Sequence, residues 1–195
     1  MIALRVWLCA RMALLSRLLR ASEASERWWG RALALAPSHP RALASIGFLK
    51  AAAGDYAAAL PWLERSAALS DAPASAWFNL GFARQQLGDH DGANQAFDRA
   101  IALDERFDRA WYGKAISMLA MARPADAIPL LERNTALQPM SPYGWYQLAH
   151  AYHRLGRADR VAATIRHLAG FEPAVARRLE RETGVCAAAG EGGCG

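Results

Sequence analysis

Apolar residues along this chain recur with a helical period, and the pattern itself returns downstream. In residues 76–83, AWFNLGFA, three residues have the spacing of one face of an α-helix: Trp77, Leu80 and Gly81. Near copies of the segment, AWYGKAIS and GWYQLAHA, follow it. Their tryptophans are separated by 34 residues each time, at Trp77, Trp111 and Trp145. A fixed period of this length indicates repeated supersecondary units.

Extending the 34-residue register in both directions predicts five repeats, at residues 6–39, 40–73, 74–107, 108–141 and 142–175. Within a repeat, one apolar stripe ends at a turn and a second one follows, so each repeat is expected to form a hairpin of two helices. Glycine marks the turn in the second, third and fifth repeats, at Gly54, Gly88 and Gly156. In the fourth repeat we expect Pro124 to break the helix instead.

Small residues are expected to face each other inside the hairpins, in the pairs Gly47 and Ala59, Gly81 and Ala93, and Ala115 and Ala127. Two backbones can then approach closely, and a bulky residue of the second helix fills the remaining space, namely Leu63, Phe97 or Leu131. Such a hairpin leaves an apolar flank that only another hairpin covers. The sequence therefore predicts an all-α solenoid of stacked helical hairpins over residues 1–184.

The last part of the chain is expected to close this stack. Residues 174–184 surround the apolar Val175 and Leu179 with arginine and glutamate, as a capping helix with one polar face does. Residues 185–195 have no apolar periodicity, so we predict a disordered glycine-rich tail there.

The third repeat resembles the tetratricopeptide repeat (TPR). It matches that family's pattern at Trp77, Leu80, Gly81, Gly88, Ala93, Phe97 and Ala100. It departs from the pattern at Arg84, where the family usually has an aromatic residue, and at Glu105, where it has a proline. The resemblance implies a right-handed α-solenoid whose first helices line a concave groove that binds an extended peptide or a short helix of a partner.

Charge changes this picture only at the ends of the chain. The net charge of +5 comes almost entirely from arginine, since Lys50 and Lys114 are the only lysines, and we do not take it as a sign of nucleic-acid binding. Residues 1–35 contain six arginines against two glutamates. Arginines interrupt the apolar run at the N-terminus, so no secretory signal or membrane span is predicted and the chain is expected to be cytoplasmic. An amphipathic helix at residues 1–20 lying on a membrane stays open as an alternative.

Candidate chemistry is sparse. The cysteines are odd in number and imply no disulfide framework, and the role of Cys186 and Cys194 is not set by the sequence. His150 and His153 lie one helical turn apart, but no acid or thiol shares their face to complete a metal site. We find no nucleophile, phosphate-loop or paired-carboxylate motif. The sequence therefore predicts a protein that is not an enzyme and needs neither a metal nor a cofactor.

The informative residues lie beside the packing stripe of each first helix. Offsets of −2, +1, +5 and +8 from the tryptophan position share one helical face, which should line the groove. With the polar residues at its edge, this face supplies the candidate partner-binding residues: Arg41, Phe48, Phe78, Asn79, Phe82, Gln85, Arg109, Tyr112, Ile116, Tyr143, Tyr146, Gln147, His150 and His153. Rows of aromatic rings with a few polar groups suit recognition of another protein.

The predicted function is a non-catalytic adaptor or scaffold that binds a protein or peptide segment. An assembly or secretion chaperone that shields an apolar client segment would have a similar groove. A scaffold attached to a membrane through residues 1–20 is a third alternative, whereas an RNA reader would need a coherent basic stripe that this groove lacks. Neither the partner nor the oligomeric state follows from the sequence.

Overall fold

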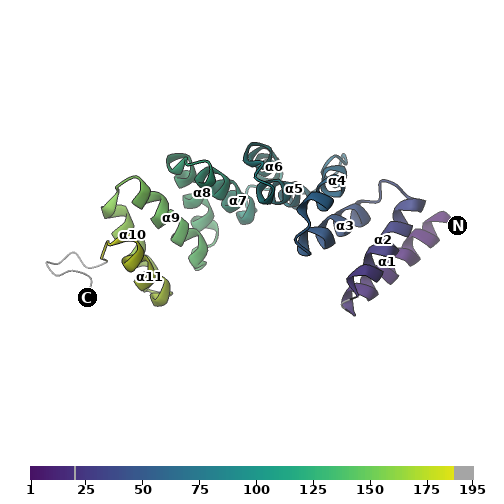
Figure 1. The fold of residues 1–195 in the computed structure, drawn as a ribbon, viewed down its shortest axis with the longest axis horizontal. Coiled ribbons are helices and arrows are strands. Elements are labelled where there is room, and N and C mark those ends of the chain that lie inside the picture. The colour runs from purple at the N-terminus through teal and green to yellow at the C-terminus, as the bar shows by residue number, and fades with distance from the viewer. Residues whose placement is uncertain (20, 187–195) are drawn as a thin grey trace. The chain divides into compact units, whose positions relative to one another are not determined.

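The computed structural model describes residues 1–19 and 21–186, and these residues form helices and turns but no β-strand. The helices are α1 (Ile2–Leu18), α2 (Ser22–Leu35), α3 (Pro40–Ala52), α4 (Tyr56–Ala67), α5 (Ala74–Gln86), α6 (His90–Leu103), α7 (Asp108–Ala120), α8 (Pro124–Leu137), α9 (Pro142–Arg154), α10 (Ala158–Ala169) and α11 (Pro173–Thr183) (Figure 1). The predicted all-α repeat architecture is confirmed, with two helices for each repeat and one more at the C-terminal end.

The chain divides into two compact bodies. The N-terminal body, Met1–Asp104, contains α1 to α6, and the C-terminal body, Glu105–Gly195, contains α7 to α11. Inside each body every helix packs against the next helix along the chain. No helix in the described part of the chain is both long and apolar enough to span a lipid bilayer.

Glycine forms the predicted turns. Gly54, Gly88 and Gly156 have φ angles of 82°, 82° and 68°, in the left-handed region that other residues rarely adopt. In two of these turns the next residue is an aspartate that caps the following helix, since Asp55 accepts the Ala58 N–H at 3.0 Å and Asp89 accepts the Gly92 N–H at 2.9 Å. A Gly-Asp pair therefore ends one helix and begins the next.

The fourth repeat turns in a different way from the prediction. Pro124 does not break a helix there, because it is in the first turn of α8. The left-handed residue is Ala122, with a φ of 57°, and it stands 34 residues after Gly88. The left-handed turn thus recurs at one register position in the second to fifth repeats, but in the fourth it is made by a residue with a side chain.

The small residues in the hairpins are buried as predicted. A Cβ atom built on Gly47 would lie 2.6 Å from Cδ2 of Leu63, and one built on Gly81 would lie 2.8 Å from Cε1 of Phe97. Leu63 and Phe97 are themselves almost fully buried. Close packing of this kind leaves no room for a larger residue at either glycine.

The capping helix α11 packs against α10 and α9 and buries Ala176 and Leu179. Glu182 ties it to α9, because one carboxylate oxygen accepts the Tyr146 hydroxyl at 2.7 Å and lies 3.1 Å from His150 Nε2. The other oxygen accepts a 2.7 Å hydrogen bond from Arg178 Nε. These donors, Arg178 first, lower the pKa of Glu182 to about 2.

Most of the predicted tail, residues 185–195, lies outside the described residues. In its described part, Val185 packs against the C-terminal core and Cys186 is disulfide-bonded. Cys9 is a free, buried cysteine of α1. The tail as a whole therefore stays a prediction, and the sequence pattern did not anticipate the disulfide.

We predict that Gly81→Ala lowers the free energy of unfolding by about 1–3 kcal/mol, because the added methyl group meets the buried Phe97 ring and lies 3.1 Å from the Ala93 carbonyl oxygen. Gly30→Ala in α2 is the matched control, since no atom lies within 4 Å of its Cβ position. Chemical denaturation measures both. Equal stability of the two variants would contradict the close approach of α5 and α6.

Ala122→Gly should raise the free energy of unfolding by about 0.5–1 kcal/mol, because glycine adopts the left-handed conformation without the Cβ clash. The reciprocal change, Gly88→Ala, should lower it, although no atom crowds the added methyl group there. Thermal and urea unfolding of both variants test this pair. A destabilised Ala122→Gly variant would show that Ala122 does not hold a positive φ.

The contacts of Glu182 predict a pH-dependent cap. Since its pKa is about 2 in the folded protein against the ordinary 4.5, these contacts stabilise the folded state fully above pH 4.5 and are lost as the pH falls towards 2. Hydrogen exchange should show α11 opening in that range. In Glu182→Gln the protection of α11 should be low already at neutral pH, whereas Asp159→Asn in α10 should keep the parent's profile.

Candidate functional site

Three of the predicted contact residues meet in the N-terminal body. Arg41 and Phe48 on α3 and Asn79 on α5 line a hollow of about 230 Å³, together with Arg17 of α1. The rest of its lining consists of Trp29, Ala44, Ser45 and Leu49. The Phe48 ring is 52% exposed, although it stands among apolar neighbours. We call this the basic hollow.

The basic hollow has a distinct charge. Both of its ionisable side chains are arginines, Arg17 and Arg41, and both are exposed. A second hollow of about 410 Å³ continues from it across Arg41, Ala44 and Asn79 and contains Asp71. An anionic group in the first hollow would therefore lie near two guanidinium groups and an apolar wall. The second hollow contains one arginine, Arg41, and one aspartate, Asp71, whose charges balance.

The predicted aromatic residues of α5 have another environment. Phe78 stacks near Phe82 with ring centroids 6.3 Å apart and lies 5.9 Å from the buried Phe97. Phe82 in turn makes an edge contact with Tyr56 of α4 at 6.0 Å. These rings pack against one another, and only Phe82 is exposed by more than a third. Gln85 is half-buried on the same helix.

In the C-terminal body the predicted residues of α7 are partly built into the core. Tyr112 is half-buried against the hydrophobic cluster, and this burial raises the pKa of its hydroxyl above 10, while a hydrogen bond with Gln147 acts in the opposite direction. Ile116 is half-buried as well. Arg109 is exposed and its guanidinium carbon lies 5.0 Å from the Phe107 ring.

Five predicted residues lie on α9; Gln147 bonds to Tyr112, and the other four fall into two pairs. Tyr146 and His150 contact Glu182 of the capping helix, and Arg178 lies 5.0 Å over the Tyr146 ring. The sequence analysis missed this use of both residues by the chain itself. Tyr143 and His153 are exposed, with 71% of the tyrosine accessible.

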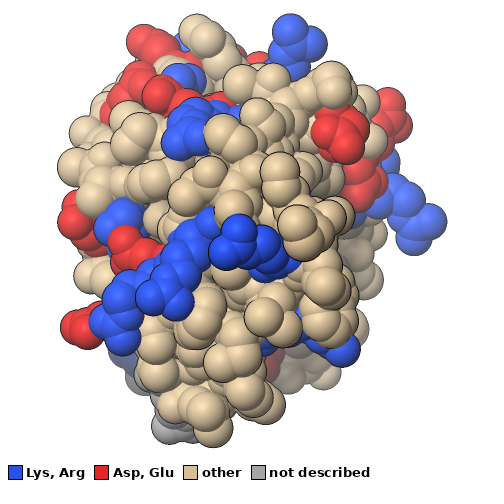
Figure 2. All heavy atoms as spheres, turned by 90° about the vertical axis from the view of Figure 1, so that its right-hand side faces the viewer, with Lys and Arg blue, Asp and Glu red and all other residues tan. Residues whose placement is uncertain are grey.

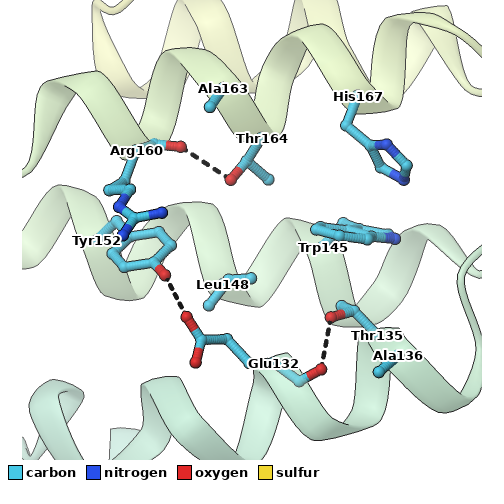
Figure 3. A pocket seen from close by; sticks show the side chains of 10 residues that line it. All are labelled: Glu132, Thr135, Ala136, Trp145, Leu148, Tyr152, Arg160, Ala163, Thr164 and His167. Atoms are coloured by element: carbon cyan, nitrogen blue, oxygen red, sulfur yellow. Dashed lines mark hydrogen bonds between the residues drawn. The ribbon is translucent and has the colours of Figure 1, made fainter.

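A further pocket of about 410 Å³ lies on the other side of α9 (Figure 3). Trp145, Leu148 and Tyr152 of α9 form its floor, α8 and α10 form its walls, and the sequence analysis did not predict it. At one end the Trp145 ring lies 4.2 Å from the His167 ring. At the other end Tyr152 donates to Glu132 at 2.7 Å, with Arg160 6.0 Å from the tyrosine ring.

At the polar end of this pocket the Tyr152 hydroxyl has a raised pKa. Burial, and then the hydrogen bond to Glu132, raise the pKa of Tyr152 to about 12. The hydroxyl is therefore protonated at neutral pH and acts as a donor to the carboxylate. This arrangement suits binding of a polar group better than proton transfer, for which a pKa near the working pH is favourable.

No cluster of three or more metal-binding side chains occurs among residues 1–19 and 21–186. The residue that sequence reasoning missed in the basic hollow is Arg17. It stands at the same offset of +8 from the repeat origin, here Cys9, as Gln85 does from Trp77. The 34-residue register, extended into the first repeat, therefore contains the signal for Arg17.

A family model for the tetratricopeptide repeat matches residues 74–107. None of the curated proteins matches the sequence. Among solved structures, MamA is similar with a TM-score of 0.77 and 19% identity, over 91% of this chain and 93% of that one. YrrB, described as a TPR protein with an unusual peptide-binding site, has a TM-score of 0.77 and 16% identity, over 89% and 90%. PilW, a type IV pilus biogenesis factor, has a TM-score of 0.74 and 16% identity, over 86% and 78%.

The match covers the repeat whose sequence agrees best with the expected pattern, apart from Arg84 and Glu105, and its turn glycine, Gly88, has the left-handed conformation. The solved structures share the helical-repeat fold at low sequence identity. The chain therefore contains a tetratricopeptide repeat at residues 74–107, and its described part shares the helical-repeat fold of these solved structures.

Proposed function

We propose that this protein is a non-catalytic scaffold that binds an extended peptide segment of another protein in the basic hollow. The observation that carries the proposal is that Arg17, Arg41 and Asn79 converge beside the exposed ring of Phe48. The bound segment has a carboxylate, from an acidic side chain or a chain end, next to an apolar or aromatic side chain.

The chemistry of the hollow supports such a ligand. Guanidinium groups bind carboxylates in bidentate geometry, and the Asn79 amide can both donate to and accept from a peptide backbone. At about 230 Å³ the hollow is smaller than typical cofactor pockets of about 300–1,000 Å³ and fits one or two side chains. The remaining peptide lies on the second hollow, which continues from the first across Arg41 and Asn79.

The fold comparison adds general support, because one of the similar solved structures is described as having a peptide-binding site. An assembly or secretion chaperone would use the same hollow for a client segment. It would differ from an adaptor in one respect, since its client would aggregate or be degraded when the protein is absent. We assign no catalytic role to any residue.

In the C-terminal body we propose a second contact area at its exposed residues. Tyr143, Arg109 and His153 are the accessible members of the predicted set, and Tyr112, Ile116 and Gln147 contribute the part of their side chains that is not packed. Tyr146 and His150 are left out of this area, because their side chains bond to Glu182 of the capping helix.

The test uses a library of random ten-residue peptides displayed on phage and selected on the full chain. Selected peptides should share an acidic residue or a free carboxyl end beside a large apolar residue. Their affinities are then measured by fluorescence polarisation. Peptides that carry neither feature would contradict the proposal.

Phe48→Ala should weaken the selected peptides about 30-fold and Arg41→Gln about tenfold, since a central aromatic anchor is commonly worth about 2 kcal/mol and a charged hydrogen bond somewhat less. Raising the salt concentration should reduce the difference in peptide affinity between the parent and Arg41→Gln, but not the difference between the parent and Phe48→Ala. Met140→Ala and Arg133→Gln alter exposed residues of the C-terminal body and serve as matched controls. Equal affinity of the parent and both hollow variants would place the binding site elsewhere.

A further inference from the structure

Helix α1 has a second apolar face that no described helix covers. Its buried residues, Val6, Cys9, Ala13 and Ser16, face α2. On the opposite side of the helix four leucines are between 48% and 79% exposed, namely Leu4, Leu8, Leu15 and Leu18. Trp7 stands beside them with 54% of its surface exposed. In a helical repeat array this flank is the one that a further hairpin or a polar cap would cover. We call it the open face.

Arginines accompany the open face. Arg11 lies in the middle of the row of leucines, 5.0 Å over the Trp7 ring, and Arg5 and Arg31 line a hollow beside Leu8. α1 contains no acidic residue, and the two glutamates of α2 are paired, Glu23 with Arg27 and Glu26 with Lys50. In the view onto this end of the molecule, a band of basic residues crosses a largely uncharged surface (Figure 2).

The other terminal helix shows how a water-exposed end is built. The outer positions of α11 include the charged Arg177 and Arg181, and Glu182 at its side bonds to α9. The open face of α1 has apolar residues at the corresponding positions and charges of one sign only. It therefore does not have the composition of a solvated cap.

A second copy of the chain is a poor occupant. Because Arg11 is central in the row of leucines, pairing of two α1 helices about a two-fold axis places one Arg11 against the other, whether the helices run parallel or antiparallel. α1 offers no carboxylate to separate the two charges. Like charges directly opposed in an interface disfavour it.

We propose that the open face binds the surface of an anionic lipid bilayer. Leu4, Leu8, Leu15 and Leu18 enter the boundary between headgroups and acyl chains, and Trp7 takes the interfacial position that tryptophan prefers. Arg5, Arg11 and Arg31 bind lipid phosphates and anionic headgroups. With Arg11 in the middle of the apolar row, α1 lies along the surface, so that this guanidinium reaches the headgroups.

The experiment is flotation of the full chain with vesicles of phosphatidylcholine alone and of phosphatidylcholine with one quarter phosphatidylglycerol. Binding to the anionic vesicles at low salt should exceed binding to the neutral ones by about tenfold and should fall when salt is raised, because each arginine at the surface adds a screened attraction.

Two double variants separate the two contributions. The first, Leu4→Ser with Leu8→Ser, removes apolar contacts, and the second, Arg5→Gln with Arg11→Gln, removes positive charge. Each should lower binding to the anionic vesicles about tenfold. The controls are Leu103→Ser with Met140→Ser, whose exposures of 57% and 67% resemble the 55% of Leu8 and the 69% of Leu4, and Arg133→Gln with Arg181→Gln. All changed residues are exposed, and circular dichroism melts verify that each variant is folded.

Three results would overturn the proposal. The first is failure of the parent to float with anionic vesicles, which would leave a partner helix with acidic residues as the occupant. The second is that the chain binds neutral vesicles as well as anionic ones, or that the control variants lose as much binding as the two α1 variants do. The third is a dimer in light scattering that the Leu4→Ser and Leu8→Ser changes dissociate, since the open face would then be an interface between two copies. Peptide binding through Arg41 and Phe48 is measured separately and does not depend on these outcomes.

Discussion

The packing of one bulky side chain against a glycine or an alanine determines how the two helices approach in the second, third and fourth hairpins. Leu63 lies on Gly47 and Phe97 on Gly81, and in the fourth repeat Leu131 and Ala115 take the corresponding places. This contact sets how closely the two helices approach and hence which residues point outward. Since a two-helix unit cannot bury both of its sides, the same contact makes each hairpin depend on a neighbour. The stability of each body is therefore distributed over contacts between its consecutive hairpins.

The two ends of the chain meet this requirement in different ways. At the C-terminal end α11 supplies a helix that is apolar on one side and charged on the other, and Glu182 bonds it to Tyr146 and His150. At the N-terminal end α1 is apolar on both sides. The first solution uses polar contacts within the chain, so it responds to pH. At the N-terminal end apolar surface stays exposed beside basic residues. These exposed basic residues are the physical reason for expecting an anionic occupant.

The periodicity of the sequence was sufficient to predict the helices, the three glycine turns and the buried small residues, because these features depend on local conformation and on contacts within one repeat. It was insufficient where a residue contacts a side chain far along the sequence. The bonds from Tyr146 and His150 to Glu182 span more than 30 residues and involve a helix outside the repeat pattern. The pocket between Glu132, Tyr152 and Arg160 also joins three helices at positions without periodicity. At Ala122 the repeat imposes the left-handed turn although the residue itself disfavours it.

Helix α1 connects the two proposed binding surfaces. Arg17, near its end, lines the basic hollow with Arg41 and Asn79, whereas the leucines and Arg11 of the same helix form the open face. The two sets have no residue in common, and they lie on different sides of the helix because positions 11 and 17 are more than one and a half turns apart in a helix of 3.6 residues per turn. A peptide in the hollow and a bilayer on the open face therefore do not compete for a side chain. In such an arrangement the hairpin of α1 and α2 would hold the peptide-binding body at a membrane surface while its hollow stays accessible.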